Sequence, residues 1–243
     1  MKTIKITILA VLLGAGFTSC KKGGVFCYKN DGDSITETRS LSDFDEVALS
    51  MSSTVNIVQG PESKVTITAS ENVMEIIETK VKGDVLEIDV KKGKCLKGKN
   101  DIIFDVETPN LEGIIISGSG DVNVKNKLIT NALDVVISGS GDVDLDSLQT
   151  NSMSTTISGS GELDVRTIAA MNHHDIVISG SGEIHAFYAE ALECEVDISG
   201  SGDCNVNVIN NLIATISGSG DVVYKGTPKV ESTVSGSGSI RPF

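Results

Sequence analysis

The sequence is dominated by one short segment, Ser-Gly-Ser-Gly, which returns at nearly constant spacing. Its seven copies begin at Ser117, Ser138, Ser158, Ser179, Ser199, Ser217 and Ser235. Successive copies are 18 to 21 residues apart. Self-similarity at a period of this length predicts a solenoid, in which each unit covers the apolar face of its neighbour.

Apolar residues occupy equivalent places around every copy. The residue before the first serine is always isoleucine or valine: Ile116, Ile137, Ile157, Ile178, Ile198, Ile216 and Val234. The residue five places after that serine is also apolar: Val122, Val143, Leu163, Ile184, Cys204, Val222 and Ile240. Alternation with a period of two predicts a strand on each side of the segment. A third apolar edge is expected at Leu128, Leu148, Ile168 and Ile209.

A unit of this length with two or three short strands is typical of one coil of a parallel β-helix. We therefore predict an all-β, right-handed parallel β-helix with 18–21 residues per coil. A stack of antiparallel hairpins is the alternative. It would require two-residue turns such as Asn-Gly between alternate strands, and it would not require a constant register.

The Ser-Gly-Ser-Gly segments are interpreted as the corners of this helix. Glycine adopts positive φ without steric cost, and without a Cβ it lets stacked backbones approach closely. The serine hydroxyls are expected to form hydrogen bonds along the stack or to nearby backbone groups. A phosphate-binding role is disfavoured, because the segments lead into strands and no Gly-Lys-Ser/Thr follows them.

The N-terminal half is predicted to hold irregular coils of the same solenoid. Val47 to Ile57 aligns without a gap with Ile114 to Val124, and Val65 to Val73 fits the same template. Residues 71–80 are alternatively assigned to one short helix. We expect a single domain over residues 37–243, with irregular coils at 37–110 and regular coils at 111–243.

The first 19 residues have the layout of a secretory signal peptide, with two lysines before a short apolar run. The following Phe-Thr-Ser-Cys resembles the lipobox of bacterial lipoproteins, although Phe17 stands where leucine is usual. This resemblance implies that Cys20 is acylated and anchors the chain to a membrane. Ordinary secretion is the alternative. Residues 20–36 are interpreted as a flexible tether.

The balance of charge limits the possible partners. The chain has a net charge of −13, which becomes −15 when Lys2 and Lys5 leave with the signal peptide. Phosphate groups would be repelled, so nucleic acid is excluded as a partner, and the body of the protein is not expected to bind anionic lipid.

Four cysteines remain after Cys20. Cys27 and Cys95 lie outside the repeats, and in an oxidising compartment they are candidates for a disulfide. Cys194 and Cys204 fall in apolar columns and are interpreted as small buried side chains. The spacing of the cysteines matches no zinc or redox motif.

Carboxylates recur four places after the first serine of the repeats and form the candidate site. The richest group is Asp121, Asp142, Asp144, Asp146, Glu162 and Asp164. We interpret it as a hydrated acidic surface, with a calcium site as the alternative. Acid and base catalysis on a polysaccharide is a further alternative, although only Arg166 lies near as a basic residue. We assign no catalytic residue and no required cofactor.

Histidines and aromatic residues are few. His174 falls in an inward column, whereas His173 and His185 are expected to face outward, and all three are interpreted as structural. Phe187, Tyr188 and Tyr224 are the few aromatic residues within the repeats, and the chain has no tryptophan. They are expected either to bind a glycan or partner or to cover the core.

The segment Ser53 to Ile88, STVNIVQGPESKVTITASENVMEIIETKVKGDVLEI, precedes the serial SGSGD loops and follows the lipobox. This combination resembles the auto-transporter adhesin head GIN domain family. The resemblance implies a secreted or envelope-attached β-helical domain of Gram-negative bacteria with a role in adhesion, and it supplies no catalytic residue.

We therefore expect a non-catalytic lipoprotein of the outer membrane that serves as a binding scaffold for a glycan or a protein, with homodimer formation open. The alternatives are a polysaccharide-degrading enzyme that uses Asp142, Asp144 and Asp146, and a structural protein that associates with itself.

Overall fold

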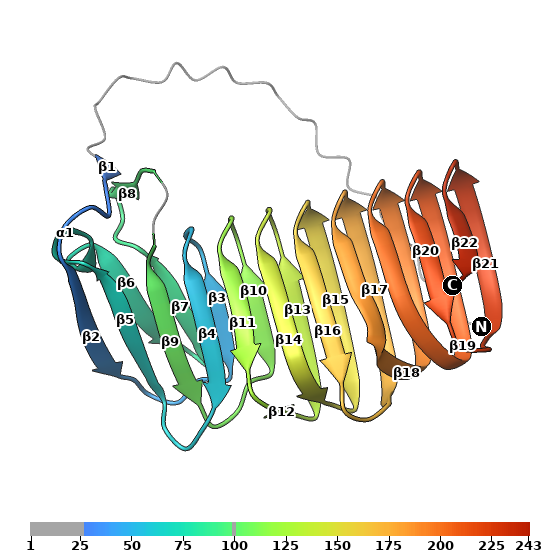
Figure 1. The fold of residues 1–243 in the computed structure, drawn as a ribbon, viewed down its shortest axis with the longest axis horizontal. Helices are drawn as coiled ribbons and strands as arrows, with labels where there is room; N and C mark the ends of the chain where they lie inside the picture. Colours follow the sequence, from blue (N-terminus) through green and yellow to red (C-terminus); the bar gives the residue numbers. More distant parts are fainter. Residues whose placement is uncertain (1–26, 99–100) are drawn as a thin grey trace, which may run out of the picture.

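The fold is a β-solenoid of about six turns. The computed structural model describes residues 27–98 and 101–243. Strands account for 68% of it and helix for 2%, which confirms the predicted all-β solenoid. Figure 1 shows the coils side by side along the long axis of the molecule. Within the described part of the chain, no helix is long and apolar enough to cross a membrane.

Each regular coil contains one strand before its Ser-Gly-Ser-Gly loop and one strand after it. The strands before the loops are β10 (Gly113–Ile116), β13 (Ala132–Ile137), β15 (Ser152–Gly159), β17 (Met171–Gly180), the second halves of β18 (Glu183–Gly200) and β19 (Asp203–Gly218), and β21 (Lys229–Gly236). The strands after the loops are β11 (Asp121–Lys125), β14 (Asp142–Gln149), β16 (Glu162–Thr167), the first halves of β18 and β19, β20 (Asp221–Lys225) and β22 (Ser239–Pro242). The short β12 (Leu128–Ile129) lies at the opposite corner.

Equivalent residues of successive coils lie directly beside one another. Ile137 is the register partner of Ile116 and of Ile157, and Ile157 is the partner of Ile178, always between parallel strands. All four side chains are fully buried. Burial of one such side chain contributes about 1.5–3 kcal/mol, so the ladder of like residues is a main source of stability. The predicted parallel register is confirmed.

The corners are joined by a ladder of backbone hydrogen bonds. The second serine of each loop donates its N–H to the first glycine carbonyl of the previous loop, as from Ser160 to Gly139 and from Ser201 to Gly180, both at 2.8 Å. A Cβ on Gly200 would lie 2.3 Å from the Gly180 carbonyl oxygen, and Gly200 has φ +138°. The carbonyl thus occupies the place of a side chain.

The serine hydroxyls do not take part in this ladder. Both serines of each loop are exposed, and the described chain contains no hydrogen bond donated by their hydroxyls. The expectation that these hydroxyls join the stacked corners is therefore wrong. The backbone alone satisfies the corners, because the glycines bring N–H and C=O groups of neighbouring coils within reach.

In the N-terminal half the spatial order of the coils differs from their order in the chain. The strand β3 (Glu46–Leu49) pairs with both β7 (Val85–Val90) and β10, and β4 (Thr54–Gln59) pairs with both β9 (Ile103–Thr108) and β11. All these pairings are parallel. The coil at residues 46–59 therefore lies between the later coil at 85–108 and the first regular coil. The predicted alignment is confirmed, because Val47 pairs with Ile114 and Ile57 with Val124.

The first end of the solenoid is closed by strands that run antiparallel. The strand β5 (Lys64–Ser70) pairs with β2 (Ser34–Ser40) and β9, and β6 (Ile77–Lys82) pairs with β7. The prediction that Val65 to Val73 forms another parallel coil is wrong. Alternation buries Val65 and Ile67 in either direction, so the pattern could not distinguish a coil from an antiparallel strand.

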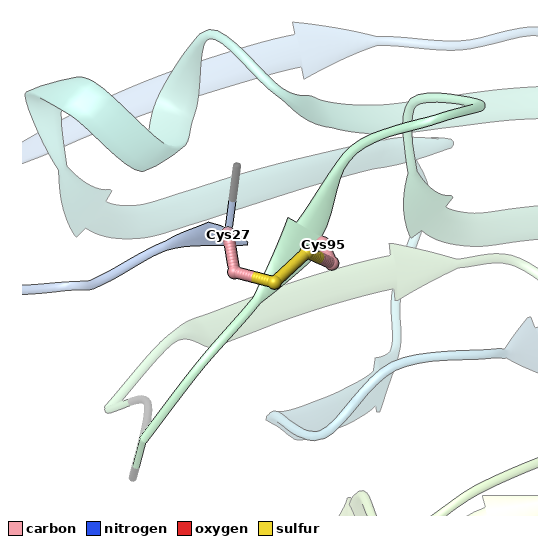
Figure 2. The surroundings of a disulfide bond; sticks show 2 residues. All are labelled: Cys27 and Cys95. Atoms are coloured by element: carbon pink, nitrogen blue, oxygen red, sulfur yellow. A yellow bond between two sulfur atoms is a disulfide. The ribbon is translucent and has the colours of Figure 1, made fainter. Parts of the chain in front are cut away.

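A short helix and a disulfide complete this end. The helix α1 (Glu71–Met74) is shorter than the predicted residues 71–80 and buries Val73 and Met74. Cys27 of β1 (Cys27–Tyr28) and Cys95 of β8 (Cys95–Leu96) form a disulfide, with Cα atoms 4.6 Å apart. Figure 2 shows this bond beside α1 and its neighbouring strands. The two candidate cysteines are thus bonded to each other, and the predicted tether includes a covalently held segment.

His174 is buried in the interior, as its column predicts. It is 1% exposed, and one ring nitrogen lies 3.2 Å from the hydroxyl of Thr155. Removal from water, with a smaller contribution from His173, lowers the pKa of His174 from 6.5 to about 4. The imidazole is therefore neutral inside the folded protein at neutral pH.

The stacked corners predict a sharp difference between two glycines. Gly200→Ala should lower the free energy of unfolding by about 3 kcal/mol, because the new methyl group meets a carbonyl and the backbone conformation is unfavourable for alanine. Gly118→Ala is the matched control, since a Cβ there meets nothing within 4 Å. Urea denaturation compares the two, and equal midpoints would contradict the stacking.

His174 predicts a loss of stability in acid. Between pH about 6.5 and about 4 the unfolded chain binds a proton at this histidine and the folded chain does not. Stability should therefore fall as the pH is lowered through this window, by up to about 3 kcal/mol from this residue. His174→Met, which copies the neighbouring Met153, should remove that part of the slope in urea denaturation at pH 7, 5.5 and 4. Parallel slopes for the two proteins would refute the assignment.

Candidate ligand-binding surface

The strands that follow the loops form one outer surface, here called the post-loop face. It consists of the outward side chains of β9, β4, β11, β14, β16, β20, β22 and the first halves of β18 and β19. Inward and outward residues alternate along each strand, so equivalent outward residues form columns across the coils. Both groups considered below lie on this face.

The six carboxylates singled out in the sequence come together, and are here called the acidic patch. Asp121 lies on β11, Asp142, Asp144 and Asp146 on β14, and Glu162 and Asp164 on β16. Asp142 is the register partner of Glu162, and Asp144 of Asp164. The sequence columns therefore placed all six correctly on one face of three adjacent coils.

Arg166 neutralises one side of the acidic patch. Its guanidinium donates to Asp146 at 2.5 Å and lies 3.7 Å from Asp144. The Oδ1 atom of Asp144 is buried and makes no hydrogen bond in the described chain. Loss of water raises the pKa of Asp144, and the nearby Asp146 raises it further. Asp121 is affected in the same way, because burial and then Asp142 raise its pKa.

His185 extends this polar group into the next coil. Its Nε2 atom lies 3.1 Å from Glu162 and 3.5 Å from Glu183, and its Nδ1 atom lies 3.3 Å from the amide nitrogen of Asn205. The predicted outward direction of His185 is confirmed. Its contacts therefore cross three coils.

The geometry gives little support to a metal centre in the acidic patch. Within residues 27–98 and 101–243, no three or more His, Cys, Asp or Glu side chains are arranged to hold a metal ion. The six carboxylates are spread over the outer side of three adjacent strands, β11, β14 and β16, instead of around a common centre. Calcium binding at these six residues stays an untested alternative to a hydrated acidic surface.

An aromatic cluster lies on the same face, near the last coils. Phe187 and Phe243 meet edge to face with their ring centres 4.9 Å apart. The ammonium group of Lys225 lies 4.4 Å from the ring of Phe187, 4.7 Å from Phe243 and 5.3 Å from Tyr188. Phe187, Tyr188, Lys225 and Phe243 are here called the aromatic cluster. Tyr188 is 70% exposed, so one large ring is open to solvent.

The cluster exists because the regular coil is interrupted there. The register between β18 and β19 shifts between Ala186 and Glu190, and the extra residues turn Phe187 and Tyr188 outward. Ile168, which was expected to form a third apolar edge, is 52% exposed beside them. That expectation is correct for the buried Leu128 and Leu148 and wrong for Ile168 and Ile209.

A cavity of about 270 Å³ opens next to Tyr188. It is lined by Thr167, Ile168, Ala169, Phe187, Tyr188, Glu190 and Asn207. One part of the lining is aromatic and aliphatic, and the rest offers a hydroxyl, a carboxylate and an amide. Sites of this composition use apolar contact for affinity and a few polar groups for orientation.

A second cavity, of about 320 Å³, lies on the opposite outer face. Its lining includes His173, Glu193, Glu195, Lys229 and Glu231. In this lining Lys229 lies 2.6 Å from Glu231, and His173 lies 2.8 Å from the neighbouring Asp175. It lacks an aromatic wall and is the weaker candidate.

The sequence matches a known protein family. The family model "Putative auto-transporter adhesin, head GIN domain" matches residues 43–228. The chain belongs to this family. The resemblance read from Ser53 to Ile88 and the serial loops is therefore confirmed. No curated protein matches the sequence of this GIN domain.

Solved structures share the fold of the GIN domain. A "putative adhesin" from Bacteroides fragilis is 24% identical with a TM-score of 0.83, over 89% of this chain and all of that one. A "putative lipid binding protein" from Parabacteroides distasonis is 25% identical with a TM-score of 0.75, over 90% and 100% of the two chains. A "putative adhesin" from Parabacteroides merdae is 22% identical with a TM-score of 0.70, over 89% and 99%.

Sequence reasoning found only part of the aromatic cluster. It noted Phe187 and Tyr188 as rare aromatic residues but did not connect them with Lys225 or Phe243. Residues 187–190 are the signal that was available, because they interrupt the alternation after Ala186. Cys20, the predicted lipid attachment site, and the signal peptide lie outside the described residues.

Proposed function

We propose that this GIN domain is a non-catalytic adhesion or binding scaffold of the cell envelope, which recognises a glycan or a protein on its post-loop face. The observation that carries the proposal is the aromatic cluster, which exposes Tyr188 beside a cavity on an otherwise polar surface. Aromatic residues of this kind are enriched where proteins bind their ligands. Membership of an adhesin family supports the same role.

The regular coils suit such a scaffold. Each coil is fixed by backbone hydrogen bonds to its neighbours, so the outer side chains are held at constant spacing on a rigid support. Binding groups on a rigid support lose little conformational freedom when a ligand arrives. The proposal includes an outer-membrane anchor at Cys20, supported by the lipobox-like Phe-Thr-Ser-Cys.

Catalysis by the acidic patch is the less favoured function. Arg166 already pairs with Asp146, and the cavity of about 270 Å³ lies at the aromatic cluster, with none of the six carboxylates in its lining. A glycoside hydrolase needs its acid and its second carboxylate on either side of a bound sugar bond. The acidic patch lies along the outer side of three adjacent strands, β11, β14 and β16, instead of on two sides of a groove.

Self-association has one observation in its favour. Within the described chain, no strand pairs with the outer edges of β21 and β22, and Val234 on β21 is 43% exposed. Free strand edges readily pair with another chain. Charged residues at this edge, Lys229 and Glu231, are of the kind that discourage such pairing.

Binding without turnover is the expected result. The full chain, applied to arrays of glycans and envelope proteins, should be retained by at least one class of ligand, and Tyr188→Ala should reduce that binding at least about tenfold. Asp142→Ala/Asp144→Ala is the matched control and should bind normally. Release of new sugar ends from a polysaccharide, lost in the control variant, would instead establish the enzyme and contradict the proposal.

A further inference from the structure

The aromatic cluster lies in an unusual charge environment. After residue 128 the chain has fifteen acidic residues and only four basic ones. Three of the four, Arg166, Lys225 and Arg241, belong to β16, β20 and β22 on the post-loop face. Arg166 is the register partner of Tyr188, and Arg241 lies on the strand beside Lys225. Positive charge is therefore concentrated around the rings on a strongly acidic solenoid.

Two of these cations are available to a ligand. Arg166 is engaged by Asp146. In the described chain, neither Lys225 nor Arg241 forms an ion pair with a carboxylate. Contact with the rings of Phe187, Tyr188 and Phe243 holds the Lys225 ammonium group in place. Lys225 is thus a fixed positive charge over the rings of Phe187 and Tyr188, two residues that line the cavity. No carboxylate of the described chain forms an ion pair with it.

The polar lining of the cavity adds hydrogen-bonding groups. Thr167, Glu190 and Asn207 supply a hydroxyl, a carboxylate and an amide to the same lining that contains the exposed ring of Tyr188. A pyranose ring has an apolar C–H face that stacks on an aromatic ring and a rim of hydroxyls that pair with such groups. At about 270 Å³ the cavity is below the usual size range for drug-sized ligands, which fits a single ring.

We propose that this cavity binds a carboxylated sugar, a single uronic acid unit of a glycan, because the cations beside the cavity offset the net negative charge of the solenoid only locally. The ring lies against Tyr188, its hydroxyls pair with Glu190 and Asn207, and its carboxylate meets Lys225, with Arg241 adding to the local positive potential. This inference rests on the proposed binding function and specifies its ligand. A protein partner fits less well, because a stable protein interface buries about 800 Å² on each side, and the exposed apolar surface here is confined to a few side chains.

Calorimetric titration of the full chain separates the contribution of the sugar carboxylate to binding from that of the sugar ring. The probe is trigalacturonate, and the matched ligand is its methyl ester, which keeps the rings and removes the negative charge. Oligosaccharides of glucuronic and mannuronic acid complete the set. The acid should bind at least about tenfold more tightly than the ester, since a charged hydrogen bond contributes about 1.5–3 kcal/mol.

Three variants locate the site. Tyr188→Ala should weaken the binding of the acid and of the ester alike, because it removes the aromatic ring on which the sugar stacks. Lys225→Gln should lower the affinity for the acid to that for the ester and leave the affinity for the ester unchanged. Lys125→Gln makes the same charge change on β11 of the post-loop face, several coils away, and should bind as the unaltered chain does. Circular dichroism of each variant checks that the solenoid is intact.

Each other outcome overturns the inference in a recognisable way. Uronate binding that survives both Tyr188→Ala and Lys225→Gln would place the site elsewhere. Equal affinity for acid and ester would remove the role of charge. If no uronate binds at millimolar concentration while the arrays capture another glycan or a protein, the inference fails and the proposed function stands. If nothing is captured in either experiment, both fail.

Discussion

The close stacking of the Ser-Gly-Ser-Gly corners is the constraint on which the rest of the structure depends. From the second Ser-Gly-Ser-Gly corner onward, a glycine carbonyl of one coil occupies the space that a Cβ of the next coil would need, as the 2.3 Å approach at Gly200 shows. This contact fixes the distance and register between coils. Once the corners are aligned, the strands on both sides are parallel and in register, and the isoleucines before the loops form an uninterrupted buried ladder. The outer columns of polar residues follow from the same alignment.

Much of this arrangement could be predicted from the sequence because the repeat carries it directly. A constant register of loop and apolar residues predicts parallel coils stacked on one another. The same columns predicted that His174 lies inside and that the six carboxylates share one face. The first end of the solenoid was harder to predict from the sequence. Alternation at Val65 and Ile67 is the same for a parallel coil and an antiparallel strand, so the direction of β5 and the insertion of residues 46–59 between later coils depend on long-range pairing. The aromatic cluster was also missed in part, since it depends on contacts between Phe187 and residues at least 38 positions away.

The regular coils and the interrupted coil have different roles in this GIN domain. Regular coils supply a rigid support with polar outer faces, and the carboxylates of the acidic patch lie on three neighbouring coils. Where the register shifts at residues 187–190, rings turn outward, a cavity opens and the ammonium group of Lys225 lies over the rings. A binding site at the interruption requires no change in the coils on either side, because each coil contacts only its neighbours. The disulfide between Cys27 and Cys95 secures the opposite end of the molecule.

Cysteine cross-linking tests the in-register stacking most directly. Thr156 and Val177 are outward register partners on β15 and β17, in the same parallel relation as the natural Cys27–Cys95 pair. Thr156→Cys/Val177→Cys should therefore form a disulfide under mild oxidation of the folded protein. Thr156→Cys/Ile178→Cys should not, because Ile178 points into the core. A disulfide in the second protein and none in the first would mean that the coils are not stacked in this register, and the account would be contradicted.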